Sequence, residues 1–294
     1  MSLKRILMQM DGDPHPSSFD SVVAIDAGVD HLLRYSGVTP QDVTSLVHGA
    51  MFTRGGDDLR HSAIFVGGSD VSTAERIFES VRKTFFGPVR VSVMLDAAGC
   101  NTTAAAAVVA AGRHVSLSGA TAVVLGGTGP VGRRVAQMLA SEHAKVRLTS
   151  RSLQRASAAC ESILAKHKHA ELTPVALHDA SAETLREALQ DASVLIACGA
   201  AGVELVDEAT IRRVATLQVA IDLNAVPPAG IGGVGVTDKA RQIDHFVVYG
   251  AIGVGGLKMK THRAAIQQLF DRNDHALDAA EIYAIARAIK TQDR

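Results

Sequence analysis

Short apolar runs that alternate with amphipathic stretches dominate residues 118–250 and predict a parallel sheet with helices between its strands. The predicted strands are 121–125, 145–149, 172–176, 194–197, 218–222 and 246–249, and the predicted helices are 131–141, 152–167, 181–190 and 207–214. Nearly continuous apolar strands are typical of a sheet that is covered on both faces. This part of the chain is therefore predicted to be a Rossmann-type domain.

Residues 1–117 show a second α/β pattern. The predicted strands are 5–10, 43–48, 62–66 and 90–95, and the predicted helices are 18–33, 71–85 and 102–111, with Ser17 or Ser18 and Asp70 as N-caps. The glycine-rich segment 251–256 is predicted to be a flexible hinge, followed by helices at 257–270 and 278–290, the latter capped by Asp278. We expect the C-terminal helices to return to the first domain. The fold class is then α/β, with a substrate domain (1–117 and 256–294), an NAD(P)-binding domain (118–255) and an interdomain cleft.

Composition narrows the class of protein. The 294 residues are 47% hydrophobic and carry a formal net charge of zero, which argues against nucleic acid or a membrane surface as a partner. The cysteines Cys100, Cys160 and Cys198 are far apart, so the sequence predicts neither a disulfide framework nor a zinc site. The sequence contains no run of about 18 apolar residues, so it predicts no membrane span. We therefore expect a cytoplasmic protein without a metal.

A glycine-rich turn between a predicted strand and a predicted helix is the most informative motif. Gly127, Gly129 and Gly132 have the G-x-G-x-x-G spacing, and Thr128, Pro130 and Val131 lie between them. In a Rossmann unit these glycines allow the tight turn, the approach of a diphosphate and the close packing of the helix. Amides at the start of the helix then bind the phosphates. The motif predicts a dinucleotide site at residues 127–132.

The end of the second strand of this domain favours NADP over NAD. Proteins that bind NAD usually have an acid there, whereas this chain has Ser150, Arg151 and Ser152, with Arg155 one helical turn further on. A guanidinium between hydroxyls suits a 2′-phosphate. The alternative interpretation is an ordinary solvated helix start, and use of NAD is not excluded.

Two more loops follow strands of the same sheet. Gly199 and Ala200, after the fourth strand, are small enough to admit a nicotinamide. Asn224, after the fifth strand, has two equal interpretations: a cofactor contact, or a turn residue before Pro227 and Pro228. Loops at the carboxyl ends of parallel strands line the ligand crevice.

The helix predicted after the hinge carries two cationic side chains on its inner face. Lys258 and His262 are spaced i, i+4 and share a side with Ala265 and Leu269. A lysine beside an apolar stripe often only snorkels, and a single buried histidine is usually a core residue. Both together at the start of a helix favour a cleft wall.

Several segments together resemble the bacterial NAD(P)-dependent methylene-tetrahydromethanopterin dehydrogenases. The segments that carry the resemblance are 11–20, 53–56, 63–68, 101–103, 127–132, 224–233 and 253–263. The resemblance implies two α/β domains with a cleft, oxidation of a pterin-bound methylene group to the methenyl cation with a nicotinamide cofactor, and a homo-oligomer such as a trimer. It further implies that Phe19 contacts the pterin, and that Thr103, Lys258 and His262 line the reacting end.

Two alternatives stay open at this point. The first is a methylene-tetrahydrofolate dehydrogenase, although the Tyr-x-x-x-Lys motif of the folate enzymes with hydrolase activity is absent: Tyr35, Tyr249 and Tyr283 all lack a lysine four residues later. The same absence disfavours a short-chain reductase. The second is a regulatory module that senses NADPH without catalysing a reaction, against which the pair Lys258 and His262 argues weakly.

Overall fold

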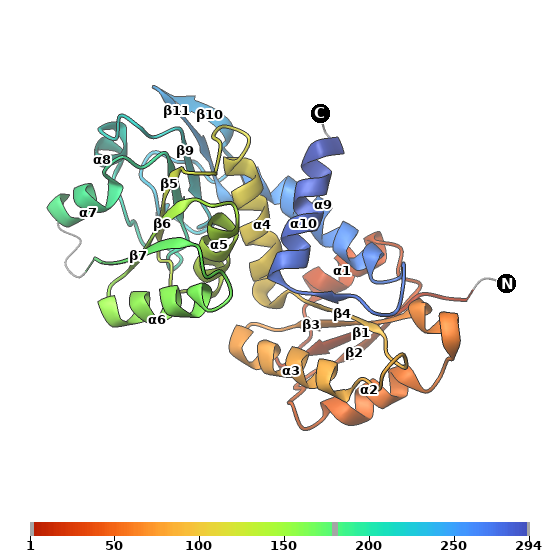
Figure 1. Ribbon diagram of the computed structural model, residues 1–294. Coiled ribbons are helices and arrows are strands. Elements are labelled where there is room, and N and C mark those ends of the chain that lie inside the picture. The colour runs from red at the N-terminus through yellow and green to blue at the C-terminus, as the bar shows by residue number, and fades with distance from the viewer. Residues whose placement is uncertain (1–2, 178–181, 293–294) are drawn as a thin grey trace. The chain divides into compact units, whose positions relative to one another are not determined.

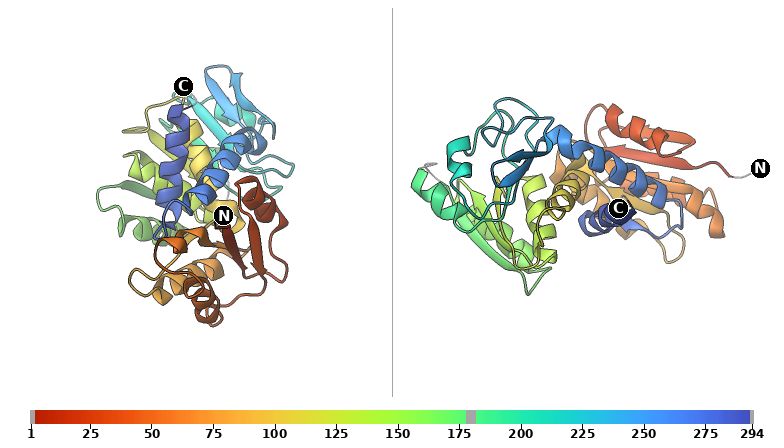
Figure 2. Two further views of the ribbon diagram at one scale, coloured as in Figure 1. Left: turned by 90° about the vertical axis from the view of Figure 1, so that its right-hand side faces the viewer. Right: turned by 90° about the horizontal axis from the view of Figure 1, so that it is seen from above.

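A computed structural model describes residues 3–177 and 182–292, and the chain divides into two compact units (Figures 1 and 2). Unit 1 comprises Met1–Thr102 and Met259–Arg294, and unit 2 comprises Thr103–Lys258. The boundaries lie inside helices α4 (Cys100–Ala111) and α9 (Ala251–Gln268), whereas the sequence placed them after residues 117 and 255.

Unit 2 contains a seven-stranded sheet in the described part of the chain. Its strands are β5 (Thr121–Leu125), β6 (Lys145–Ser150), β7 (Glu171–Ala176), β8 (Val194–Ala197), β9 (Val219–Asp222), β10 (Lys239–Ile243) and β11 (Phe246–Tyr249). The order is β10-β11-β9-β8-β5-β6-β7, and every pair is parallel except β10 with β11. This confirms the predicted Rossmann-type parallel sheet. Strand β10 was not predicted, because four of its five residues are exposed and it lacks an apolar run.

Helices cover both faces of this sheet. Those of unit 2 are α5 (Pro130–Ser141), α6 (Leu153–Leu164), α7 (Ala182–Leu189) and α8 (Glu208–Arg212). Leu185 and Leu189 of α7 and Ile211 of α8 share one core cluster with strand residues such as Leu195 and Phe246. Helices α5 and α6 pack on β5, β6 and β7, on the other face of the sheet. The first residue of the helix predicted at 181–190 lies outside the described residues.

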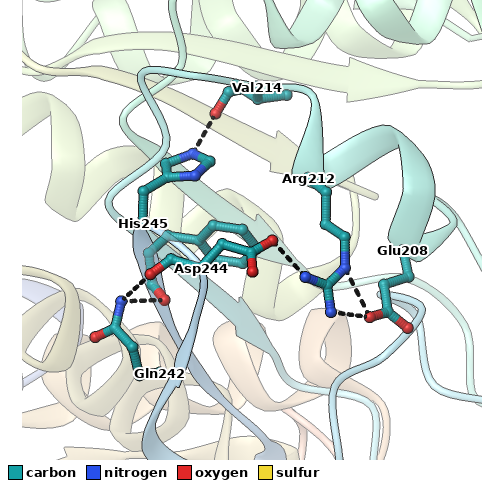
Figure 3. Close-up of polar contacts among 7 residues, drawn as sticks. Glu208, Arg212, Val214, Gln242, Asp244 and His245 are labelled. Carbon is teal, nitrogen blue, oxygen red and sulfur yellow. Dashed lines mark hydrogen bonds and ion pairs between the residues drawn. The ribbon is translucent and has the colours of Figure 1, made fainter.

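Polar contacts join α8 to the β10–β11 turn at the amino edge of this sheet (Figure 3). Arg212 forms ion pairs with Glu208 and Asp244, and the His245 ring lies 2.9 Å from the Val214 carbonyl oxygen. Gln242 donates to the carbonyl oxygens of Asp244 and Phe246. These contacts lie at the edge opposite the carboxyl ends of the strands, away from the loops that follow β5, β8 and β9.

Unit 1 contains a smaller parallel sheet in the described residues. Its strands are β1 (Ile6–Asp11), β2 (His31–Tyr35), β3 (Ser62–Gly67), β4 (Ser92–Leu95) and β12 (Ala276–Leu277), in the order β12-β4-β3-β1-β2. The helices are α1 (Ser18–Asp26), α2 (Val43–Met51), α3 (Val71–Thr84) and α10 (Ala279–Gln292), with 3₁₀ turns η1 (Gly56–His61) and η2 (Ala97–Gly99). Strand β12 pairs with β4, so the C-terminal segment returns to this unit as predicted.

Two predicted elements of unit 1 and one of unit 2 are wrong. Residues 43–48 form helix α2 and not a strand, because the buried residues Val43, Val47 and Met51 recur at helical spacing. The helix predicted at 18–33 ends at Asp26, since Gly28 has a left-handed φ of +87°, and the chain then enters β2. The predicted hinge is helical, because α9 begins at Ala251.

Other local predictions are confirmed. The Ser17 hydroxyl caps α1 by accepting from the amide of Asp20, and Asp70 caps α3 by accepting from the amide of Ser72. Residues 104–111 of α4 are buried on every side, as expected for an alanine-rich helix without a polar face. Within residues 3–177 and 182–292, no helix combines the length and the apolar character that crossing a bilayer requires.

Candidate active site

The loop after β5 forms a left-handed turn that touches a neighbouring loop. The left-handed residue is Gly126, with φ +68°, and not Gly127, which the motif placed at the turn. A Cβ atom on Gly126 would lie 2.8 Å from the Cα atom of Gly199, which follows β8. The loops after β5 and β8 therefore meet at the point where the strand order reverses, which is where open α/β sheets bind their ligands.

The last two glycines of the motif have different surroundings. A Cβ atom on Gly132 would lie 2.6 Å from the Gly126 carbonyl oxygen, so helix α5 packs directly on the turn. A Cβ atom on Gly129 would meet its nearest neighbour, the same oxygen, only at 3.7 Å. Gly129 thus borders open space at the start of α5.

The start of α5 offers backbone donors to an anion. Gly129 is the N-cap and Pro130 the first helical residue, and among the described residues no side chain caps this helix. The first amides of a helix have no acceptor within the helix, so those of Val131 and Gly132 point out of its N-terminus. Such amides, together with the partial positive charge of a helix N-terminus, are able to bind a phosphate group.

Hydroxyl groups link the glycine loop to the end of β6. The Thr128 hydroxyl lies 3.5 Å from that of Ser150, and the Ser152 hydroxyl caps α6 by accepting from the amide of Arg155. Arg151 and Arg155 are exposed at the start of this helix. The guanidinium groups and the helix N-terminus all favour a negative charge beside these hydroxyls.

The loops after β8 and β9 contain the other predicted cofactor residues. Ala200 is exposed and Gly199 half-buried beside the glycine loop. The Asn224 side chain bonds within its own loop: its oxygen accepts from the Val226 amide at 3.0 Å, and its nitrogen donates to the Pro228 carbonyl at 3.0 Å. These contacts favour the turn interpretation of Asn224 over a direct cofactor contact.

In unit 1, an aromatic cluster brings together two of the predicted substrate residues. The His262 ring is fully buried and stacks on Phe65, with centroids 5.7 Å apart and an interplanar angle of 22°. Phe19, at the start of α1, lies 6.4 Å from His262 between ring centroids and is 49% exposed. The cluster therefore presents one half-exposed aromatic ring backed by two buried ones.

Thr103 and Lys258 lie on the two helices that run through the boundary between the units. Lys258 is half-buried, one turn before His262 on α9, and Thr103 is half-buried near the start of α4. The start of α4 is held by Asp96, which accepts from the amides of Asn101 at 2.9 Å and Thr102 at 3.1 Å. The backbone that carries Thr103 is thereby fixed. The roles of Thr103 and Lys258 stay predictions.

Three buried aspartates at strand ends were missed by the sequence reasoning. Asp11 ends β1, Asp96 follows β4 and Asp222 ends β9, and each is at most 1% exposed. Each accepts hydrogen bonds from the amides of the loop that follows its strand. An acid directly after an apolar strand was the available signal, because such a position lies at the ligand-binding edge of a parallel sheet.

The arrangement suits a dinucleotide in unit 2 and an apolar ring in unit 1. The described residues contain no group of three or more histidine, cysteine, aspartate or glutamate side chains that could hold a metal ion. Burial raises the pKa of the Cys198 thiol, and the Asp222 carboxylate adds to the effect, so this thiol beside the crevice stays protonated. The polar groups at the glycine loop and the end of β6 are backbone amides, hydroxyls and guanidinium groups.

Comparisons with solved structures agree with this fold. Shikimate 5-dehydrogenase from Listeria monocytogenes aligns over 97% of this chain and 96% of its own, with a TM-score of 0.55 and 13% identity. Quinate dehydrogenase from Corynebacterium glutamicum aligns over 97% of this chain and 100% of its own, with a TM-score of 0.50 and 12% identity. At these identities the likeness concerns the fold alone.

Sequence comparisons are more specific. Residues 18–98 match the family model described as methylene-tetrahydromethanopterin dehydrogenase, N-terminal. A Methylorubrum extorquens protein named bifunctional protein MdtA is 45% identical over 97% of this chain and 98% of its own length. The NAD(P)-dependent methylenetetrahydromethanopterin dehydrogenase of the same organism is 30% identical over 96% of this chain and 98% of its own. The chain belongs to the methylene-tetrahydromethanopterin dehydrogenase family.

Proposed function

We propose that this protein transfers a hydride from the methylene carbon of methylene-tetrahydromethanopterin to NADP, giving the methenyl cation in one-carbon oxidation. The observation that carries the proposal is the 30% identity, over nearly the full length of both chains, to an enzyme named for this reaction. The glycine loop of unit 2 and the aromatic cluster of unit 1 supply the two kinds of surface that the reaction needs.

The residues of unit 2 fit an NADP molecule. The amides at the start of α5 suit the diphosphate, and the open space beside Gly129 lets it approach the backbone. Arg151 and Arg155, with the hydroxyls of Ser150 and Ser152, suit the 2′-phosphate, and no acid stands at the strand end to favour the unphosphorylated ribose of NAD. NAD remains a slower alternative acceptor. When bound, the nicotinamide supplies the hydride-accepting carbon.

The reaction requires the chain to position the substrate carbon and the hydride acceptor, and it requires no removal of a proton. The methylene carbon must lie about 3–3.5 Å from the acceptor, and the adjacent nitrogens stabilise the cation that forms. Phe19 offers the pterin an apolar face, Thr103 orients it, and the buried His262 ring supports Phe19 from the protein side. An uncompensated Lys258 ammonium beside a cationic product would be unfavourable, so Lys258 bonds to a pterin oxygen or nitrogen.

The test mixes the protein with each reduced methylene pterin and each nicotinamide, and follows the methenyl absorbance. We expect oxidation of methylene-tetrahydromethanopterin with NADP faster than with NAD. Signal with methylene-tetrahydrofolate only would establish the folate alternative. Binding of NADPH without any turnover would establish the regulatory alternative.

A matched pair of lysine variants tests the substrate site. Lys258→Ala is expected to lower kcat/KM for the pterin at least tenfold, about the effect of one lost hydrogen bond to a charged group. Lys260→Ala, an exposed lysine on the same helix, is the control and is expected to keep wild-type kinetics. Wild-type kcat/KM in Lys258→Ala would remove Lys258 from the site.

We also propose that the protein is a cytoplasmic homo-oligomer. Val22 and Ile25 of α1 and Leu33 of the edge strand β2 are between 42% and 61% exposed, which is the kind of surface that a second copy would cover. All three cysteines are thiols, as expected in a reducing compartment. Light scattering coupled to gel filtration measures the assembly, for which we expect a trimer or a multiple of it.

A further inference from the structure

Three loops at the carboxyl edge of the unit 2 sheet pack against one another in series. The turn at Gly126 touches Gly199, as described above. A Cβ atom on Gly199 would lie 2.6 Å from the Leu205 side chain, so this loop folds back on itself. The Leu205 amide then donates to the Gly230 carbonyl oxygen at 2.8 Å, which joins the loop after β8 to the loop after β9. The three loops are therefore in direct contact with one another.

Asp222 joins the two ends of the third loop, residues 223–231. It ends β9, is 1% exposed, and its two carboxylate oxygens accept from the amides of Asn224 at 2.9 Å and Ile231 at 3.1 Å. One carboxylate thus bridges the beginning and the end of the segment 223–231. Burial raises the pKa of Asp222 while the amide hydrogen bonds oppose the shift, so these bonds offset part of the cost of a buried charge.

The interior of this loop is braced as well. The Asn224 side chain bonds to the backbone of Val226 and Pro228, and the Gly232 amide donates to the Val206 carbonyl oxygen at 2.8 Å. A loop that is held at both ends and in its middle offers a ligand a fixed surface, whereas a loose loop would have to be ordered when the ligand binds.

The position of this loop within the sheet assigns it to one half of the cofactor. The strand order runs β9-β8-β5-β6, so the start of α5 lies between the β6 end, with Arg151, and the β9 end, with Asp222. With the diphosphate at α5 and the 2′-phosphate beside Arg151, the nicotinamide half extends over β8 and β9. The inference rests on the proposed function in this one respect, that unit 2 binds a nicotinamide dinucleotide.

We propose that Asp222 is a positioning residue for the nicotinamide: by bridging Asn224 and Ile231 it keeps the 223–231 loop in the shape against which the nicotinamide half of NADP lies. Asp222 acts through this loop and does not touch the reacting atoms. Its removal should therefore weaken the nicotinamide half of the cofactor selectively and leave the adenosine half unaffected.

The experiment measures binding of NADP and of adenosine 2′,5′-bisphosphate, which has the phosphorylated adenosine half but no nicotinamide. Asp222→Asn replaces one of the two acceptor oxygens by an amide nitrogen that cannot accept. We expect NADP to bind about tenfold more weakly, the order of one lost charge-assisted hydrogen bond, and adenosine 2′,5′-bisphosphate to bind within about twofold of wild type. Equal weakening of both ligands, or of neither, overturns the proposal.

A second variant keeps the test decisive if Asp222→Asn does not fold. A Cβ atom on Gly230 would lie 3.0 Å from Asp222 Oδ1, so Gly230→Ala displaces the same carboxylate without changing its charge. We expect weakening of NADP alone, and wild-type NADP affinity in this variant would overturn the proposal. Gly49→Ala in α2, where an added Cβ atom meets nothing within 4 Å, is the control for the extra methyl group.

These measurements are separate from the proposed reaction because no pterin is present. A protein that shows the selective loss of NADP affinity but oxidises no pterin would refute the reaction and keep the role of Asp222. If the protein oxidises the pterin while Asp222→Asn and Gly230→Ala bind NADP normally, the reaction is supported and the role of Asp222 is refuted.

Discussion

Two alanine substitutions in the glycine loop separate the packing of α5 from the binding of the diphosphate. In Gly129→Ala the new methyl group lies 3.7 Å from its nearest neighbour, and the backbone, at φ −71° and ψ 169°, suits any residue. Alanine is a poorer N-cap than glycine, so we expect a stability loss of at most about 1 kcal/mol. The fold should therefore tolerate this change.

Gly132→Ala has the opposite consequence for stability. Its methyl group would lie 2.6 Å from the Gly126 carbonyl oxygen and 2.7 Å from the Gly127 Cα atom, both of which are backbone atoms that cannot swing aside. The start of α5 must then move away from the turn. Overpacking of this kind typically costs about 1–3 kcal/mol.

Cofactor binding should nevertheless fall in both variants. In Gly129→Ala the methyl group enters the open space through which the diphosphate reaches the amides of Val131 and Gly132. One lost hydrogen bond to a charged group costs about 1.5–3 kcal/mol, which corresponds to roughly a tenfold to hundredfold weaker binding of NADPH. The assays are urea unfolding without cofactor and titration of NADPH by its fluorescence. Wild-type affinity in Gly129→Ala, or a stability loss in it equal to that of Gly132→Ala, would refute the assignment of the loop.

Three further predictions concern other parts of the molecule. Arg151→Ala should raise KM for NADP about tenfold and leave KM for NAD unchanged; an equal rise for both would remove Arg151 from the 2′-phosphate site. Hydrogen bonds from the hydroxyls of Thr73 and Ser72 lower the pKa of Asp70 from 3.8 to about 2, so the unfolded chain takes up this proton first and the stabilisation is lost as pH falls from 3.8 towards 2. In Asp70→Asn the melting temperature should fall less steeply over that range, and an unchanged slope would contradict the assignment. His262→Leu should cost about 0.5–1.5 kcal/mol of stability through the lost stacking on Phe65, measured by urea unfolding; a variant as stable as wild type would show that the stacking contributes nothing.

Where the residues of an element share one local pattern, the sequence was sufficient to predict that element. Strands 121–125, 194–197 and 246–249 have the predicted bounds. A strand that is buried on both faces of a parallel sheet is a continuous apolar run, so its bounds can be predicted from its own residues. The capping residues Ser17 and Asp70 were also predicted, since a cap bonds only to its own helix.

The wrong elements are those in which local preference opposed tertiary packing. The β-branched residues of 43–48 favour a strand, but burial at helical spacing makes this segment α2. The glycines of 251–256 suggested a hinge, yet α9 passes so close to another segment that a Cβ atom on Gly253 would overlap the Asp238 carbonyl oxygen. Close packing therefore requires glycine at position 253, whereas a Cβ atom on Gly255 or Gly256 would meet nothing within 4 Å. No local sequence pattern distinguishes these positions.

The sequence by itself determined the fold class, the glycine-rich loop after β5, the absence of an acid after β6 and the family. Each of these depends on residues that are neighbours in the chain or on a motif of fixed spacing. Only the tertiary structure decided that Gly126 makes the left-handed turn, that Asn224 serves its own loop, and that Asp222 bridges the loop after β9. A hydrogen bond depends on distance and direction in space, and those are set when separate loops pack together at the sheet edge.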